Sequence, residues 1–166
     1  MRQLLLNPLH MIVPFILGSK VDLDHAKKIA EVLDNYGIKY EMHIASAHKA
    51  PAVTLEIIEK YNEKKESVVF VTIAGRSNAL SGLVAGSTHC PVIACPPFSD
   101  KADYLTNVHS SLQMPSETPV LTVIDPKNAG QAVARILGVT NKDLAKKIKN
   151  HTKIVKKTFN VKPLKK

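Results

Sequence analysis

Short apolar runs alternate along this chain with stretches that have a helical apolar pattern, and this alternation is the strongest constraint on its fold. The apolar runs at residues 11–17, 39–45, 67–74, 91–95 and 120–124 predict strands. The stretches at residues 22–36, 51–61, 78–87, 101–112 and 128–137 are each typical of a helix. Such alternation predicts a parallel sheet with helices on both faces. We therefore expect an α/β fold, a three-layer doubly wound sheet of flavodoxin- or Rossmann-like type, with a further C-terminal helix.

Two prolines bear on these elements. Pro14 lies inside the first predicted strand. Because proline has no N–H to donate, Pro14 must lie at an edge or at an unpaired site of the sheet. Pro51 opens the second predicted helix, at a position where helices tolerate proline. The residues of this helix expected to face inward are Val53, Ile57, Ile58 and Tyr61.

Length and composition fit one globular domain. A chain of 166 residues holds one core of ordinary size, and 45% hydrophobic with 22% charged residues is not typical of disorder. No apolar run reaches the roughly 20 residues of a membrane span. Cys90 and Cys95 match neither a disulfide framework nor a C-x-x-C site, so we expect a reduced, cytoplasmic protein. We expect residues 1–10 to be an N-terminal extension, not a signal peptide, before a domain at residues 11–140.

The positive charge is confined to one end of the chain. The formal net charge is +9, and the whole excess lies in residues 141–166, because acidic and basic residues balance before residue 141. Leu144, Ile148 and Val155 keep helical spacing in this lysine-rich C-terminal segment. We expect a solvated helix that ends before Pro163 and no nucleic-acid partner. The alternative is non-specific, salt-sensitive binding of RNA, an anionic lipid or another polyanion.

Four loops that follow predicted strands are rich in glycine, serine, proline and ionisable residues. They span residues 18–22, 46–51, 75–78 and 96–100, and we call them the first to fourth loops. Loops at the opposite edge, such as residues 63–66, are merely charged. In doubly wound folds a ligand binds beyond the carboxyl ends of the strands. The sequence therefore predicts a small-molecule site formed by the four loops.

Side chains in the first three loops suit a phosphorylated ligand. Ser19 precedes a helix whose N-terminal amides favour an anion, and Lys49 and Arg76 add positive charge from neighbouring loops. Asp22 is an acceptor suited to sugar hydroxyls, although helix N-capping alone would explain both Ser19 and Asp22. His48 is the candidate for proton transfer near neutral pH, with a hydrogen-bonded loop histidine as the alternative.

Other ligand classes are not supported by the sequence. No pair of histidines has metal-ligand spacing with a carboxylate or thiol, so we expect no metal. A phospho-receiver domain requires carboxylates where this chain has Leu17-Gly18 and Ala74-Gly75. A dinucleotide-binding domain requires G-x-G-x-x-G after the first strand, where only Gly18 is present.

Five segments together resemble the aminoimidazole ribonucleotide carboxylase family of purine biosynthesis. They are Gly18-Ser19-Lys20-Val21-Asp22, Ser46-Ala47-His48-Lys49, Ala74-Gly75-Arg76-Ser77-Asn78-Ala79-Leu80-Ser81-Gly82, Cys95-Pro96-Pro97 and Ser110-Ser111-Leu112-Gln113-Met114-Pro115. They follow the family's order and spacing over residues 11–138. The mutase branch of the family usually has arginine at the position of Lys49 and a histidine in the third loop. This chain, which has neither, resembles class II, which carboxylates its substrate directly with carbon dioxide.

The resemblance implies a reaction and a site. The implied enzyme is a carboxy-lyase that converts 5-aminoimidazole ribonucleotide and CO2 to 4-carboxy-5-aminoimidazole ribonucleotide, without ATP, biotin, metal or another cofactor. By similarity, His48 is the catalytic proton-transfer base. Ser19, Ser46 and Lys49 are the implied phosphate ligands, and Asp22 contacts the ribose hydroxyls.

The rest of the implied site binds the new carboxylate or closes over the substrate. Gly75 and Ser77 are expected to hydrogen-bond the carboxylate, and Arg76 to contact the substrate or to pack between subunits. The residues implied to close the site are Gln113, Met114 and Asn128. The family assembles as octamers with shared sites, so a homo-octamer is implied. The mutase reaction is the alternative within the family, and a non-catalytic phosphate- or polyanion-binding module is the alternative outside it.

Overall fold

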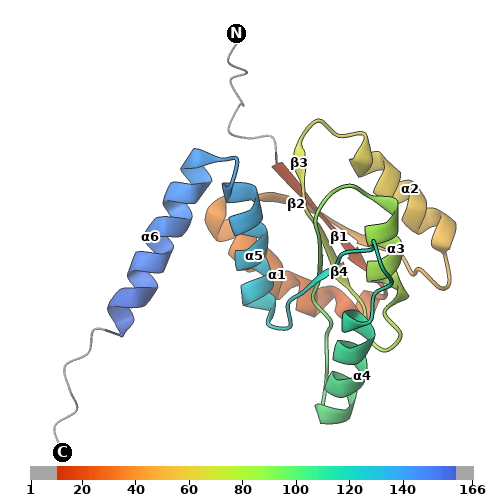
Figure 1. Cartoon of the computed structure of the whole chain (residues 1–166). Coiled ribbons are helices and arrows are strands. Elements are labelled where there is room, and N and C mark those ends of the chain that lie inside the picture. The colour runs from red at the N-terminus through yellow and green to blue at the C-terminus, as the bar shows by residue number, and fades with distance from the viewer. Residues whose placement is uncertain (1–10, 160–166) are drawn as a thin grey trace, which may run out of the picture.

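The computed structural model describes residues 11–159 as a parallel sheet between two layers of helices (Figure 1). Its strands lie in the order β2-β1-β4-β5-β6, and β3 pairs with β1 just before β4. All the pairings are parallel, so the predicted doubly wound α/β fold is confirmed. The strands are β1 (Met11–Leu17), β2 (Lys39–Ile44), β3 (Ser67–Val68), β4 (Phe70–Ile73), β5 (Val92–Ala94) and β6 (Leu121–Thr122).

The helices follow the predicted order with small changes at their ends. The fifth begins two residues earlier than predicted, at Pro126, because Asp125 caps it by accepting a hydrogen bond from the Asn128 N–H at 2.7 Å. The helical elements are η1 (Lys20–Asp22), α1 (Leu23–Tyr36), α2 (Pro51–Asn62), α3 (Ala79–Ser87), α4 (Lys101–Leu112), α5 (Pro126–Gly138) and α6 (Lys142–Thr158).

Pro14 lies in a central strand, at a site that is unpaired on one side. β1 pairs with β2 along residues 12–17, including Pro14 opposite Glu41. On its other side, pairing with β3 stops at Ile12 and pairing with β4 resumes at Phe15. Pro14 therefore lies in the part of β1 that is unpaired on this side, where β3 ends and β4 begins, so its missing N–H interrupts no pairing there. The predicted single strand at 67–74 is accordingly split into β3 and β4.

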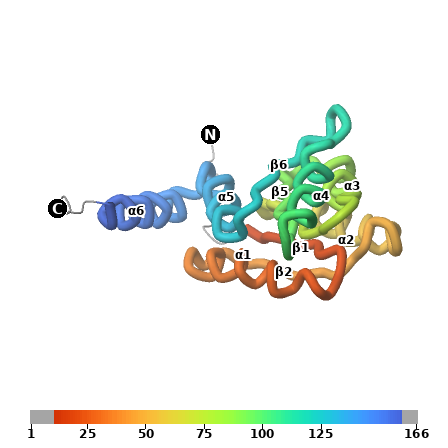
Figure 2. Tube along the Cα trace, turned by 90° about the horizontal axis from the view of Figure 1, so that it is seen from below, coloured from red at the N-terminus to blue at the C-terminus, as the bar shows by residue number. Residues whose placement is uncertain are grey.

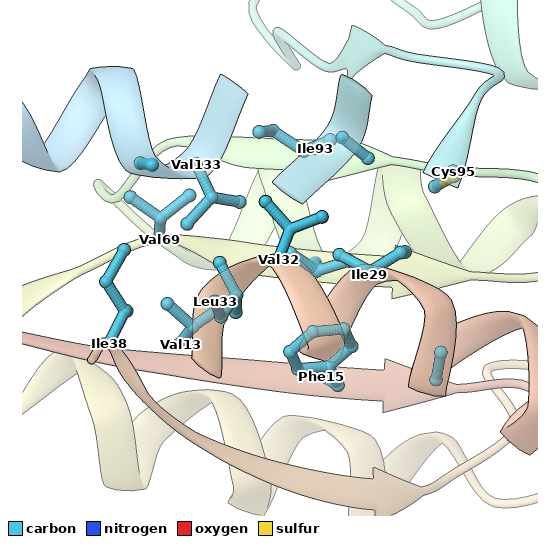
Figure 3. Packing of buried hydrophobic residues seen from close by; sticks show 14 of the residues in the cluster. Val13, Phe15, Ile29, Val32, Leu33, Ile38, Val69, Ile93, Cys95 and Val133 are labelled. Carbon is cyan, nitrogen blue, oxygen red and sulfur yellow. The ribbon is translucent and has the colours of Figure 1, made fainter. Parts of the chain in front are cut away.

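Alternating residues of β1 enter two apolar cores, one on each face of the sheet. Val13 and Phe15 belong to the core under α1 and α5, whereas Ile12 and Ile16 belong to the core under α2 and α3. This division follows from the two-residue period of a strand. Figure 3 shows the first core, in which side chains of α1 and α5 meet those of the sheet.

One residue of α2 departs from the predicted packing. Thr54, Ile58 and Tyr61 form its buried stripe, and Val53 is 47% exposed. A helix turns about 100° per residue, so Val53 lies to the side of a stripe that begins at Thr54. The prediction that Val53 faces inward was wrong, because Thr54 takes the buried position instead. Thr54 can be buried since its hydroxyl donates to the Ala50 carbonyl oxygen at 3.2 Å and is not left without a partner.

Gly130 permits the close packing of α5 on α1. A Cβ atom at this position would lie 2.7 Å from the Val32 Cβ and 3.0 Å from the Ile29 carbonyl oxygen. We expect Gly130→Ala to lower the free energy of unfolding by about 1–2 kcal/mol, since overpacking outweighs the gain in helix propensity. Chemical denaturation measures the change. Gly86→Ala is the matched control, because its Cβ would make only an ordinary contact of 3.4 Å with Thr118. Equal stability of the two variants would contradict the expectation.

The helix α6 packs on the domain from Leu144 to His151, whose ring lies edge-on to Tyr36 with centroids 6.1 Å apart. Leu144 is buried, and the Lys147 ammonium donates to the Tyr36 carbonyl oxygen at 2.9 Å. The last turns of the helix extend away from the sheet (Figure 2), which leaves Ile154 and Val155 exposed. The predicted helix in the lysine-rich segment is thus present, whereas Pro163 and residues 1–10 lie outside the described residues. Among residues 11–159 there is no helix with the length and apolar character needed to cross a membrane.

Candidate active site

The four predicted loops line one pocket of about 840 Å³. The pocket lies at the carboxyl edge of the sheet, next to β1. The chain runs from β1 outward to β2 on one side and then returns to add β4 on the other side, so the strand order reverses at β1. In doubly wound folds the ligand usually binds at such a point of reversal. The residues that both the sequence predicts and the pocket contains are Ser19, Asp22, Ser46, His48, Lys49, Gly75, Arg76 and Ser77.

The first loop is held by backbone bonds and by a capping box between Ser19 and Asp22. The Gly18 N–H donates to the Ile73 carbonyl oxygen at 2.9 Å, and the Ser19 N–H donates to Asp22 Oδ2 at 2.9 Å. Ser19 is the N-cap of η1 and forms a capping box with Asp22, so the capping role considered for both residues is present alongside their place in the pocket. Asp22 is only 6% exposed. This burial raises the pKa of its carboxyl group, and the bond from Ser19 opposes the rise.

The second loop is a tight turn that presents two ionisable side chains. The Ala50 N–H donates to the Ser46 carbonyl oxygen at 2.8 Å, and the Lys49 N–H donates to Ser46 Oγ at 3.3 Å. His48 and Lys49 are both exposed and line the pocket. Within residues 11–159 neither side chain has a hydrogen-bond or ion-pair partner. The imidazole and the ammonium group are therefore both free to contact a ligand.

The third loop contains a residue in an unusual conformation. Arg76 has a φ of 57°, in the left-handed region, which costs about 1–2 kcal/mol for a residue with a Cβ atom. Its N–H donates to Asn107 Oδ1. The next turn of chain is fixed to α4, since the Asn78 N–H donates to Ser110 Oγ at 2.6 Å and Asn78 Nδ2 donates to Ser111 Oγ at 2.9 Å.

The pocket also contains residues that the sequence reasoning missed. Asp103 and Asn107 of α4 line it, and Phe98 of the fourth loop is 46% exposed there, packed edge-on against Tyr104. One feature of the sequence could have indicated these two residues: Asp103 and Asn107 are four residues apart in the helix that directly follows the fourth loop. Residues with this spacing share one helix face, which here is directed at the loops.

A buried cysteine lies next to a histidine at the end of β5. His25 Nε2 is 3.3 Å from Cys95 Sγ. Burial raises the pKa of the Cys95 thiol to about 12 and lowers the pKa of His25. A protonated thiol is a poor nucleophile, so this pair suits packing and not covalent chemistry. Elsewhere in residues 11–159 no group of three or more His, Cys, Asp and Glu side chains is arranged to hold a metal.

Three residues implied by the resemblance lie outside this pocket in the single chain. Gln113 follows the end of α4, roughly 15 Å along the helix axis beyond Asp103. Met114 lines a separate hollow with Ser111, and Asn128 faces the groove between α5 and α6. In the single chain α4 and α5 carry these residues away from the four loops, so their part in closing the site stays a prediction.

Comparison with known proteins agrees with this geometry. The model of the AIR carboxylase family matches residues 12–158. A phosphoribosylaminoimidazole carboxylase of Archaeoglobus fulgidus is 50% identical over 133 residues, 80% of this chain and 72% of that protein. A bifunctional phosphoribosylaminoimidazole carboxylase/phosphoribosylaminoimidazole succinocarboxamide synthetase of Drosophila melanogaster is 41% identical over 80% of this chain, which spans only 30% of that protein.

A solved structure gives the same result for the fold. The crystal structure of Treponema denticola PurE superposes with a TM-score of 0.85 at 37% identity, covering 90% of this chain and 94% of that chain. The family match includes all four pocket loops and extends through α6. The chain therefore belongs to the AIR carboxylase family.

Proposed function

We propose that this protein carboxylates 5-aminoimidazole ribonucleotide with CO2 in purine biosynthesis, without ATP or biotin. The observation that carries the proposal is the pairing of His48 and Lys49 on one exposed turn, in a pocket that also contains Ser19 and Asp22. A proton acceptor, an anion ligand and a hydroxyl ligand are thereby brought together. Two relatives that are named phosphoribosylaminoimidazole carboxylase support the same reaction.

The reaction needs a base and an aminoimidazole ring that is held in a fixed orientation toward CO2. The ring carbon adjacent to the one that bears the exocyclic amine is enamine-like, and the electron pair of the C=C bond between them forms the new C–C bond to the carbon of CO2 while one C=O π pair moves to oxygen. The ring carbon then carries both a proton and a carboxylate. His48 removes that proton, and the C–H electron pair restores the aromatic ring. Proton transfer of this kind contributes about 10²–10⁴-fold to a rate.

The first two loops bind the phosphate and ribose of the substrate, which are distant from the reacting ring carbon. Lys49 contributes a charged donor to the phosphate, with hydroxyl donors from Ser19 and Ser46 beside it. Asp22 uses Oδ2 for the Ser19 N–H, which leaves Oδ1 for the ribose hydroxyls. The two ends of the ribose phosphate are thus fixed independently of the ring.

The third loop binds the carboxylate as it forms. Gly75 and Ser77 line the pocket and supply hydrogen-bond donors, and Arg76 adds a positive charge between them. Donors placed where negative charge develops lower the barrier because they need no reorganisation during the reaction.

We further propose that the protein acts as a cytoplasmic homo-octamer. Gln113, Met114 and Asn128 lie outside the pocket of their own chain, so they would reach a bound substrate only from a neighbouring subunit. Cys90 and Cys95 are both free thiols, in keeping with a reducing compartment.

A direct assay separates the proposed reaction from the mutase reaction. Purified protein is incubated with aminoimidazole ribonucleotide and bicarbonate in the absence of ATP, and in parallel with the nitrogen-carboxylated isomer. We expect product from the first mixture at a rate that rises with dissolved CO2. A clear preference for the isomer would instead assign the mutase reaction, and binding without turnover of either substrate would assign a non-catalytic module.

A further inference from the structure

We propose that Asn107 is a positioning residue, which holds the third loop in the conformation that binds the carboxylate. The inference rests on the proposed function, because it concerns the loop that receives the new carboxylate. Asn107 lies on α4, distant in sequence from the loop, and is only 1% exposed.

Both polar groups of the Asn107 side chain bond to the backbone of pocket loops. Oδ1 accepts the Arg76 N–H of the third loop. Nδ2 donates to the Pro97 carbonyl oxygen of the fourth loop at 2.6 Å. One buried amide therefore ties two walls of the pocket together. A carboxamide suits this position because it offers one acceptor and one donor at the same end of a short side chain.

The third loop needs such support because its backbone is strained at Arg76. A φ of 57° is unfavourable for any residue with a Cβ atom, and it persists only where surrounding structure holds it. The bond from the Arg76 N–H to Asn107 is the contact made at the strained residue itself. The amide also packs closely on the neighbouring backbone, since a Cβ at Gly75 would lie 3.1 Å from Asn107 Nδ2.

Other bonds from α4 to this region have a different target. Ser110 and Ser111 bond to Asn78, the N-cap of α3, which does not line the pocket. Of these three residues only Asn107 forms a hydrogen bond with Arg76, which lines the pocket. The loss of Asn107 should therefore affect catalysis more than it affects the attachment of α4.

Two substitutions separate the bonds of Asn107 from the space that it fills. Asn107→Ala removes both bonds, whereas Asn107→Asp keeps an acceptor for the Arg76 N–H, and its buried carboxyl group, held protonated by the neighbouring Pro97 carbonyl oxygen, supplies an O–H donor in place of Nδ2. We expect Asn107→Ala to lower kcat for carboxylation about 30-fold, with KM for aminoimidazole ribonucleotide changed less than threefold, because misplacing a reacting group by about 1 Å costs up to 10²-fold. We expect Asn107→Asp to recover kcat to within about fivefold of the parent protein.

The matched control is Asn62→Ala. Asn62 also joins two segments, donating to the Ser87 carbonyl oxygen at 2.9 Å and accepting from Thr88 Oγ1 at 2.6 Å, but it lies at the opposite edge of the sheet. Its loss should lower the melting temperature and leave kcat within twofold of the parent value. If Asn62→Ala and Asn107→Ala reduced kcat equally, the role of Asn107 would be general stability and the proposal would be wrong.

Amide hydrogen exchange of residues 75–78 tests the inference without any turnover. We expect faster exchange at Arg76 in Asn107→Ala, and near-parental exchange in Asn107→Asp. Unchanged exchange in the alanine variant, or an aspartate variant as slow in catalysis as the alanine variant, would overturn the proposal. If the parent protein itself failed to carboxylate aminoimidazole ribonucleotide, the proposed function would fail, and the exchange experiment would still decide whether Asn107 holds the loop.

Discussion

Replacing His48 with asparagine is expected to lower kcat for carboxylation by about 10²–10⁴-fold while aminoimidazole ribonucleotide still binds. His48 is exposed in the pocket and has no bonding partner among residues 11–159, so its loss leaves no buried group unsatisfied. Asparagine retains a polar side chain but does not accept a proton near neutral pH. Steady-state kinetics measure the loss, and isothermal titration calorimetry measures the remaining affinity.

The control for this substitution is a histidine at the other edge of the sheet. His89 is exposed in the segment between α3 and β5, and it does not line the pocket. His89→Asn should leave kcat unchanged. A His48→Asn protein with more than a tenth of the parental kcat would show that another group accepts the ring proton.

Replacing Lys49 with alanine is expected to weaken binding of the substrate by about 1.5–3 kcal/mol, the range for one hydrogen bond to a charged group. This corresponds to roughly 10–150-fold in Kd. The effect on kcat should be smaller, because the phosphate is distant from the reacting carbon. Calorimetry at two salt concentrations measures the change, and the parental affinity should fall more with added salt than that of the variant, which lacks the charge.

Lys65→Ala is the matched control for the phosphate assignment. Lys65 is exposed in the turn between α2 and β3, at the edge away from the pocket. It has no ion-pair partner among the described residues, as is true of Lys49. If Lys49→Ala kept parental affinity, Lys49 would not be a phosphate ligand.

The sequence was sufficient for the fold and for most of the pocket. The apolar alternation predicted every strand region and the order of the helices, because each element has its own period of apolar residues. The four loops were predictable because parallel strands place all their carboxyl ends at one edge. The interruption between β3 and β4 was not predicted as such, although Pro14 signalled an unpaired site.

The residues that were missed or misplaced depend on contacts between distant segments. Asn107 lies in a helix with no local feature that marks it as part of a site, and only the tertiary fold brings it to Arg76 and Pro97. Gln113 and Met114 were assigned to the site by resemblance alone, which does not specify whether the same chain or a neighbour supplies them. Val53 was misplaced because apolar character does not determine on its own which side of a helix is buried.

The two cores that share β1 also fix its alignment with β4. Because successive side chains of a strand point to opposite faces, a shift of one residue would exchange the side chains that β1 sends into the two cores. The native alignment avoids this exchange and places Pro14 where β1 is unpaired on one side. The same alignment brings the ends of β1 and β4 together, so the packing of apolar side chains far from the substrate sets the relative height of the first and third loops.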